Sequence, residues 1–335
     1  MFDGLAWLEE AERLSAFLEA RLPAEEILSS LQSLHPDALT LEALKQLHHA
    51  IWQRRHPDFH DMPNKPSVLL DTCGTGGSGI EGYNTSTTVA IVLASMGVSV
   101  LKFGNRAATS RSGSFDFLEA LGLQTPLPNE KVFPLLEETG LSFLMAGQVY
   151  PDLVKLAPFR KACGHPTAFN FLGPLLNPTL PTHRVLGCAN AQVLPLLGQY
   201  LEEERFQNEY SLLVRAENGL DEAHPTFKNK GLYIRQNKSG QSRPLMLEIL
   251  PLQVKIAESL TKEGFSASEN VKRFDEILDG RDCSSLVYWQ VVFNSALAWQ
   301  LLHPKESLNT AIQKVEETLA SGQSKTYWQH FQHAV

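Results

Sequence analysis

The chain lacks the features that define several large classes of protein. In its 335 residues no apolar run reaches the roughly 18 residues that a membrane-spanning helix requires. The N-terminal stretch MFDGLAWLEEAERLSAF is acidic and amphipathic, unlike a signal peptide. Internal repeats and low-complexity tracts are also missing. We therefore expect a globular, cytoplasmic protein that does not contact membranes.

Cysteine and net positive charge are scarce as well. The four cysteines lie far apart, with no Cys-x-x-Cys pair and no Cys/His spacing typical of zinc sites. Such cysteines are expected to be reduced thiols in a cytosolic protein. The net charge is −8, whereas proteins that bind nucleic acids usually carry a basic surface. Nucleic acid is therefore disfavoured as a partner on charge grounds, while a local basic pocket for a small anion stays compatible with this composition.

Hydrophobic spacing predicts a small helical region followed by a larger α/β region with a mainly parallel sheet. Up to about residue 60 apolar residues recur at helical intervals, and the proline-containing segment RRHPDFHDMPNKP then interrupts the pattern. Beyond it, short apolar runs alternate with helical stretches, as in βαβ units. The expected division is a helical domain at 1–65 and an α/β domain at 66–335. The expected strands lie at 67–71, 98–103, 141–146, 183–190, 210–217 and 231–236, and the expected helices between them at 86–96, 112–122 and 192–204.

The most distinctive stretch is DTCGTGGSGIEGYNTSTTVAIVLASMG, which places five glycines between Gly74 and Gly82 in front of a predicted helix. Glycines let the backbone approach a phosphate closely, and a helix N-terminus presents unpaired N–H groups to its charge. The spacing Gly-x-Gly-x-x-Gly also matches the dinucleotide fingerprint. However, the next strand ends near Lys102, without the acidic residue that would bind a ribose hydroxyl. An NAD-dependent oxidoreductase is therefore disfavoured, and a P-loop is excluded because no Lys-Ser/Thr pair follows the glycines.

Two further loops follow strand ends and are expected at the same edge of the sheet. The segment KFGNRAATSRSGS supplies Lys102, Arg106 and Arg111, which together with the amides of the glycine loop would suit a pyrophosphate-like group. Asp221 and Glu222 follow a later strand, and carboxylates opposite a pyrophosphate are candidate Mg²⁺ ligands. The alternative reading is an ordinary turn with a solvated charged rim. Two such loops after consecutive strands favour the anion site.

Seven motifs, in order, resemble those of the anthranilate phosphoribosyltransferase family, whose fold is related to that of the pyrimidine nucleoside phosphorylases. They are GTGGSG (74–79), NTST (84–87), KFGNR (102–106), SRSGSFD (110–116), RKACG (160–164), FNFLGPLLNP (169–178) and GLDE (219–222). The resemblance implies that a segment near 150–180 completes the helical domain, that the active site lies at the hinge, and that the helical domain forms a homodimer. The implied reaction joins anthranilate to phosphoribosyl pyrophosphate with Mg²⁺ and releases pyrophosphate, a step of tryptophan synthesis.

The resemblance also implies roles for particular residues. Those expected to bind phosphoribosyl pyrophosphate are Gly74, Thr75, Gly76, Gly77, Gly79, Asn84, Ser86, Thr87 and Lys102. Those expected to bind Mg²⁺ are Ser86, Asp221 and Glu222. Those expected to line the acceptor site are Asn105, Arg160, Phe103 and Tyr150. No Ser/His/Asp or Cys/His set is evident, which suits the reaction because a neutral aromatic amine is already a nucleophile.

Three positions depart from the family pattern. Phe103 and Tyr150 stand where the family has histidines that line the acceptor channel, and Ser78 stands where it has an aspartate of the phosphoribosyl pyrophosphate loop. The two aromatic rings still offer flat walls, Tyr150 adds a hydroxyl, and Arg160 offers a fork for a carboxylate. The expected acceptor is therefore anthranilate or a related planar acid. A non-catalytic or nucleic-acid-binding paralogue on the same fold is the alternative.

Overall fold

The apolar runs of the sequence assemble into one seven-stranded sheet with the order β3-β2-β1-β4-β5-β6-β7. A computed structural model describes residues 5–80, 82–106, 112–203, 210–235, 244–256, 265–281 and 283–335. The strands are β1 (Leu70–Gly74), β2 (Val100–Gly104), β3 (Leu141–Met145), β4 (His183–Gly187), β5 (Tyr210–Ala216), β6 (Asn229–Arg235) and β7 (Leu245–Ile249).

The first five strands are parallel to one another, whereas β6 runs antiparallel to β5 and β7 antiparallel to β6. The parallel part carries the central strand β1, which lies between β2 and β4. Because the carboxyl ends of parallel strands meet at one edge, the loops after β1, β2 and β4 begin side by side. This edge is where the sequence places its glycine-rich and basic loops.

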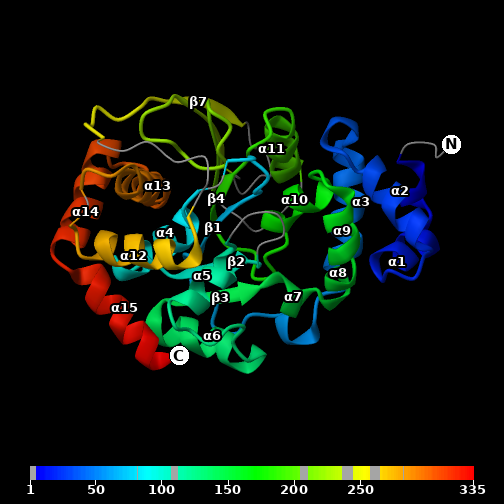
Figure 1. Cartoon of the computed structure of the whole chain (residues 1–335), viewed down its shortest axis with the longest axis horizontal. Helices are drawn as coiled ribbons and strands as arrows, with labels where there is room; N and C mark the ends of the chain where they lie inside the picture. Colours follow the sequence, from blue (N-terminus) through cyan, green and yellow to red (C-terminus); the bar gives the residue numbers. More distant parts are fainter. Residues whose placement is uncertain are drawn as a thin grey trace.

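Six helices surround one side of the sheet (Figure 1). They are α4 (Thr85–Ser95), α5 (Ser114–Ala120), α12 (Ala267–Leu278), α13 (Leu286–Leu302), α14 (Leu308–Ala320) and α15 (Gln323–Ala334). Helix α4 packs on β1 and β2 and is covered in turn by α13 and α15, so nearly all of its side chains are buried. This position explains why its sequence is apolar all round and lacks an amphipathic pattern. The start of α4 is thereby fixed beside the carboxyl end of β1.

A second group of helices lies at the opposite end of the molecule (Figure 1). Its members are α1 (Ala11–Leu18), α2 (Ala24–Ser33), α3 (Leu41–Trp52), α8 (Pro151–Lys155), α9 (Ala157–Cys163) and α10 (Ala168–Leu172). Helix α2 packs against α9, the Phe17 and Phe169 rings lie 6.1 Å apart, and the Ala168 N–H donates to the Leu34 carbonyl at 2.9 Å. Helices that precede β1 in the sequence and helices that follow β3 therefore share one apolar core.

The remaining helices lie outside these two sets. They are α6 (Asn129–Thr139), α7 (Ala146–Val149), α11 (Val193–Glu203) and the 3₁₀ helices η1 (Ala6–Glu9), η2 (Pro36–Ala38), η3 (Pro57–Phe59) and η4 (Gly173–Leu175). Helix α11 packs on β5 and β6 and also touches α3, and η4 touches β2. No helix in the described ranges is both long and apolar enough to cross a membrane. The four cysteines are free thiols.

The α/β class and the mainly parallel sheet predicted from the sequence are confirmed, with differences in detail. The first strand begins at Leu70, three residues later than expected, and Val68 is 42% exposed. The strand expected at 231–236 lies antiparallel to its neighbour, because the connection from β5, residues 217–228, contains no crossover helix. The sequence patterns did not predict α6 or the edge strand β7.

Candidate functional site

The glycine loop after β1 adopts a backbone that only glycine takes readily. Gly76, Gly77 and Gly79 have φ values of 62°, 75° and 68°, in the left-handed region. A side chain at these positions would strain the backbone. The loop therefore has a defined shape. Its backbone conformation requires glycine at these three positions, all of which were predicted to wrap an anion.

Asp221, in the segment after β5, holds the glycine loop by a hydrogen bond and by close packing. The Gly76 N–H donates to Asp221 Oδ2 at 2.7 Å, and a Cβ on Gly74 would collide with the same carboxylate. The Asp221 backbone also crosses so close to Gly187 that any side chain there would meet it. The loops after β1, β4 and β5 are thus packed backbone to backbone. Thr75 adds to this, because its N–H donates to the Gly187 carbonyl at 2.9 Å.

Glu222 stands beside Asp221 and is held by helix α13. Gln290 Nε2 donates to Glu222 Oε2 at 2.6 Å, and Asn294 holds both the N–H and the carbonyl of Ala223, at 2.9 and 2.8 Å. Burial, together with the neighbouring Asp221 carboxylate, raises the pKa of Glu222 to about 8. Burial also raises the pKa of Asp221, while the hydrogen bond from Gly76 acts in the opposite direction. Two carboxylates crowded in this way favour a cation between them.

Lys102 faces the start of α4 from β2. Its side chain is 3% exposed, and Nζ donates to the Thr72 carbonyl at 2.6 Å and to Ser86 Oγ at 3.2 Å. Burial lowers the pKa of Lys102, whereas Asp71 and the more distant carboxylates act to raise it. An ammonium has three N–H donors, so one is left for a ligand. Thr87, by contrast, is buried in the first turn of α4.

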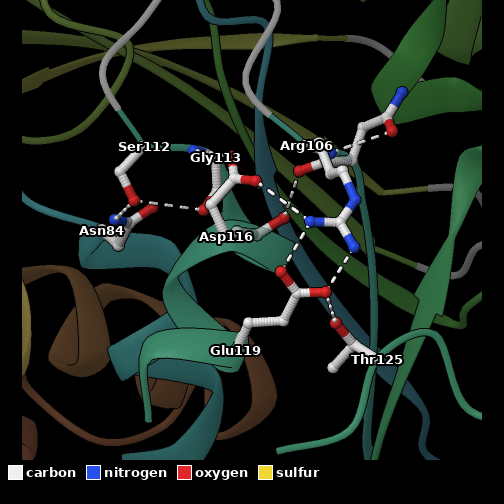
Figure 2. Close-up of polar contacts among 9 residues, drawn as sticks. Asn84, Arg106, Ser112, Gly113, Asp116, Glu119 and Thr125 are labelled. Atoms are coloured by element: carbon white, nitrogen blue, oxygen red, sulfur yellow. Dashed lines mark hydrogen bonds and ion pairs between the residues drawn. The ribbon is translucent and has the colours of Figure 1, made fainter. Parts of the chain in front are cut away.

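Arg106 does not face the glycine loop, contrary to the expectation from the sequence. Its guanidinium pairs with Glu119 through both terminal nitrogens and with Asp116 Oδ1 at 3.3 Å, both on α5 (Figure 2). These two carboxylates of α5 neutralise the charge of the Arg106 guanidinium. Figure 2 also shows Asn84 Nδ2 donating to Ser112 Oγ, at 3.1 Å. Arg111 lies outside the described residues.

The residues expected at the acceptor side differ in their environments. Phe103 and Tyr150 are buried and in edge-to-face contact with ring centroids 6.4 Å apart, and the Tyr150 hydroxyl donates to the Leu176 carbonyl at 2.9 Å. That hydroxyl is therefore engaged within the protein. Asn105 is exposed, and its side-chain oxygen accepts from the Arg106 N–H at 2.9 Å.

Arg160 stands apart from these residues. Its guanidinium carbon lies 5.4 Å from the centroid of the Phe169 ring, and burial lowers the pKa of Arg160. Within the part of the chain that the structure describes, no carboxylate pairs with this guanidinium. Near it along the chain, Pro166 lies 3.4 Å from the position of a Cβ on Gly77, so the segment after α9 touches the glycine loop.

The structure thus brings together the glycine loop, Ser86, Lys102, Asp221 and Glu222, whereas no direct contact joins them to Arg160 in the described ranges. The sequence reasoning missed several buried polar residues that hold this site: Asp71, Asn177, Asn270, Gln290 and Asn294. Asp71, Asn177 and Asn270 stand singly among their neighbours in the sequence and give no spacing signal. For Gln290 and Asn294, the four-residue interval on a mostly apolar helix was the available clue.

The donors in this site suit a hard cation. In the described ranges no cluster of three or more His, Cys, Asp or Glu residues could hold a metal ion by itself. Asp221 and Glu222 with the Ser86 hydroxyl offer oxygen ligands only, and Mg²⁺ commonly combines one or two carboxylates with phosphate oxygens and water. The set fits Mg²⁺ that arrives with a phosphorylated ligand.

Comparison with known sequences places the chain among transferases. The α/β domain of a glycosyl transferase family matches residues 66–325. The anthranilate phosphoribosyltransferase of Synechococcus elongatus is 33% identical over 309 residues, which cover 92% of this chain and 82% of the relative. That of Caldicellulosiruptor saccharolyticus is 30% identical over 323 residues, covering 95% and 92%.

Solved structures agree in fold. Anthranilate phosphoribosyltransferase from Thermus thermophilus superposes with a TM-score of 0.80 at 27% identity, covering 99% of both chains. The enzyme from Saccharomyces cerevisiae, in complex with phosphoribosyl pyrophosphate and Mg, has a TM-score of 0.83 at 24% identity, covering 98% of this chain and 93% of its own. At that identity the second likeness speaks for the fold alone.

Proposed function

Because the chain belongs to the anthranilate phosphoribosyltransferase family, we propose that it transfers the phosphoribosyl group of phosphoribosyl pyrophosphate to anthranilate or a closely related aromatic amino acid, as in tryptophan synthesis. The observation that carries this proposal is the glycine loop. Three of its glycines have a left-handed backbone, and Asp221 accepts a hydrogen bond from the Gly76 N–H. The loop lies near the start of α4 and near Lys102. That arrangement offers backbone amides, a helix N-terminus and a buried cation to one anion.

The residues of this site would stabilise the leaving pyrophosphate. As the bond to the sugar breaks, negative charge grows on the pyrophosphate, and preorganised donors lower the barrier most where charge develops. The free N–H of Lys102 and the amides of the glycine loop would supply such donors. Asp221, Glu222 and Ser86 would hold Mg²⁺, which neutralises phosphate charge when bound. Gln290 and Asn294 would keep the two carboxylates in place.

The acceptor would be held at the segment that carries Arg160. An unpaired guanidinium stacked on Phe169 is suited to grip a carboxylate with two parallel hydrogen bonds. Phe103 and Tyr150 would form an aromatic wall, and the Tyr150 hydroxyl would stay hydrogen-bonded to the Leu176 carbonyl. The exposed amide of Asn105 would reach the ribose or the acceptor. We also propose a helical domain of 1–65 completed by 150–180, a homodimer formed through it, and a cytoplasmic location.

The test is turnover of phosphoribosyl pyrophosphate with Mg²⁺ and a panel of aromatic amino acids and plain carboxylates. We expect pyrophosphate release only with an aromatic amine that carries a carboxylate. Substituting histidine for both Phe103 and Tyr150 is expected to raise kcat/KM for anthranilate, because two polar contacts of the channel return. Failure of every acceptor, with intact binding of phosphoribosyl pyrophosphate, would favour the non-catalytic paralogue.

The metal role is tested separately. Asp221→Asn with Glu222→Gln keeps the size of both side chains but removes the two carboxyl groups that can ionise against a bound cation, so Mg²⁺-dependent binding of phosphoribosyl pyrophosphate should weaken by at least tenfold in calorimetry. Glu217→Gln, at an exposed position just past the end of β5, serves as the control and should bind as the wild type does. Unchanged binding in the double variant would refute the metal assignment.

A further inference from the structure

The two central strands of the site, β1 and β2, are paired only at their first residues. Strands β1 and β2 are in register at a single pair, Leu70 with Val100. On their other sides the pairing continues to the strand ends, Gly74 opposite Gly187 and Gly104 opposite Met145. The backbone ladder between β1 and β2 is therefore missing along most of their length. Something else must fix the distance between the glycine loop and the loop after β2.

Asp71 bridges this gap from one face of the sheet. It is fully buried, and Oδ1 accepts from the Phe103 N–H at 3.2 Å, a group that a regular ladder would pair with β1. Oδ2 accepts from Asn177 Nδ2 at 2.9 Å. Asn177 also donates to the Leu101 carbonyl at 3.2 Å. One carboxylate thus ties β1 to β2 and to the loop after η4.

Lys102 bridges the same gap from the opposite face, since side chains alternate along a strand. Its ammonium crosses from β2 to the Thr72 carbonyl of β1 and to Ser86 Oγ of α4. The Thr72 hydroxyl in turn donates to the Ser86 carbonyl at 3.0 Å. The position of the ammonium therefore depends on how far apart the two strands stand.

Asp71 and Lys102, which bridge the two strands, also interact electrostatically. Asp71 lies near both Lys102 and Arg184, and both cations favour its ionised form, although burial raises the pKa of Asp71. Arg184 is fully buried, and its guanidinium nitrogens find no hydrogen-bond partner in the described part of the protein. Asp71 is therefore a buried anion near two buried cations, and an uncompensated charge at that depth would be costly.

We propose that Asp71 is a positioning residue for phosphoribosyl pyrophosphate, which it aligns by fixing the β1–β2 separation and with it the ammonium of Lys102. The inference rests on the function proposed above. Asp71 touches no ligand in this scheme. Its hydrogen bond with the Phe103 N–H sets the separation of the two strands, and that separation affects the ligand through Lys102.

The variant Asp71→Asn tests this. Asparagine has the same shape, but its amide places a donor against either the Phe103 N–H or Asn177 Nδ2 and removes the charge. We expect phosphoribosyl pyrophosphate with Mg²⁺ to bind at least tenfold more weakly in calorimetry, while KM for the acceptor changes less than twofold. Ser142→Ala, at a fully buried serine of β3, is the matched control and should bind as the wild type does. Equal affinity in Asp71→Asn and wild type would overturn the proposal.

A double-mutant cycle with Lys102→Met separates positioning from general damage. If Asp71 acts through Lys102, the double variant should bind no more weakly than Lys102→Met alone, within twofold. Independent, multiplying losses would overturn the inference. A wild type that does not bind phosphoribosyl pyrophosphate at all would instead refute the proposed function, so the two failures are distinguishable.

Should Asp71→Asn fail to fold, Asn177→Ser carries the test. It keeps the Asp71 charge but removes the hydrogen bonds from Asn177 to Asp71 Oδ2 and to the Leu101 carbonyl, and with them the contacts of Asn177 Oδ1 with Thr179. Binding at least threefold weaker than wild type, with a folded protein by circular dichroism, is the expected result. Wild-type affinity in this variant would count against Asp71 as a positioning residue.

Discussion

At the scale of single residues, pairing decides which cations are available to a ligand. Arg106 is bound to two carboxylates of α5, whereas Arg160 lies over the Phe169 ring and pairs with no carboxylate in the part of the chain described. A guanidinium already paired at the surface contributes little to binding. An unpaired one in a partly buried place is a candidate for contact with an anionic acceptor.

Arg160→Lys is therefore expected to raise KM for the acceptor by about tenfold, on the scale of roughly 1.4 kcal/mol per factor of ten. An ammonium cannot present the planar fork that a carboxylate accepts. KM for phosphoribosyl pyrophosphate should stay within twofold. Arg106→Lys is the matched control and should change neither constant. Equal losses for both substrates in Arg160→Lys would indicate a structural role in place of acceptor binding.

The residues of the site were predictable from the sequence to different degrees. The glycines were found because their left-handed backbone leaves a compositional signal. Arg106 was misplaced because its partner Glu119 lies 13 positions away on a helix, and charge alone does not say which group it meets. Asp71 and Asn177 were missed because 106 residues separate them and only the folded chain brings them together.

At the scale of elements, the glycine loop is packed directly against the Asp221 segment. Gly74→Ala would drive a Cβ into the Asp221 carboxylate, and such overpacking typically costs about 1–3 kcal/mol. We expect this loss in urea unfolding, together with loss of Mg²⁺-dependent binding of phosphoribosyl pyrophosphate. Gly82→Ala is the control, because nothing lies within 4 Å of its Cβ position and its φ is not positive. Identical stability of the two variants would contradict the close packing.

Helix α3 contributes a pH dependence through His48. Burial lowers the pKa of His48 to about 4, below its ordinary 6.5, and the folded protein therefore binds fewer protons than the unfolded chain between these values. Its contribution to stability is complete above pH 6.5 and is lost as the pH falls towards 4, at most roughly 3 kcal/mol. His224 acts in the same direction, because burial lowers its pKa to about 4 as well.

His48→Gln should accordingly lose less stability than the wild type when unfolding is compared at about pH 7 and about pH 4.5, on either side of the ordinary histidine pKa. The carboxylates titrate in both proteins, so the difference between their losses of stability reports on His48 alone. A wild type and variant with the same loss on acidification would show that His48 is not held neutral.

Element boundaries were predictable where a strand is almost entirely apolar, as at Leu141–Met145, where Ser142 is the one polar residue. They shifted where pairing and not hydrophobicity sets the start. Val68 is apolar, yet β1 begins only at Leu70, where the strand meets His183 of β4. The edge strand β7 was missed although four of its five residues are apolar, because a short apolar run without alternation does not distinguish a strand from other structures.

At the scale of the whole molecule, the proposed homodimer makes a simple prediction. Sedimentation equilibrium should give twice the 37.2 kDa of one chain at micromolar concentration. Asp221→Asn with Glu222→Gln should not change this mass, because those residues lie at the sheet edge and not in the helical domain. A monomer across the concentration range would contradict a dimer formed through that domain.

The contact between α2 and α9 also has a consequence for how the protein is made. Leu34 and Ala168, which share a hydrogen bond, are about 130 residues apart, on the order of ten seconds of translation at roughly 5–20 residues per second. During that interval the apolar faces of the first helices have left the ribosome without their cover. Nascent chains are then suited to capture by a chaperone, and a ribosome that stalls before α9 would prolong this exposure.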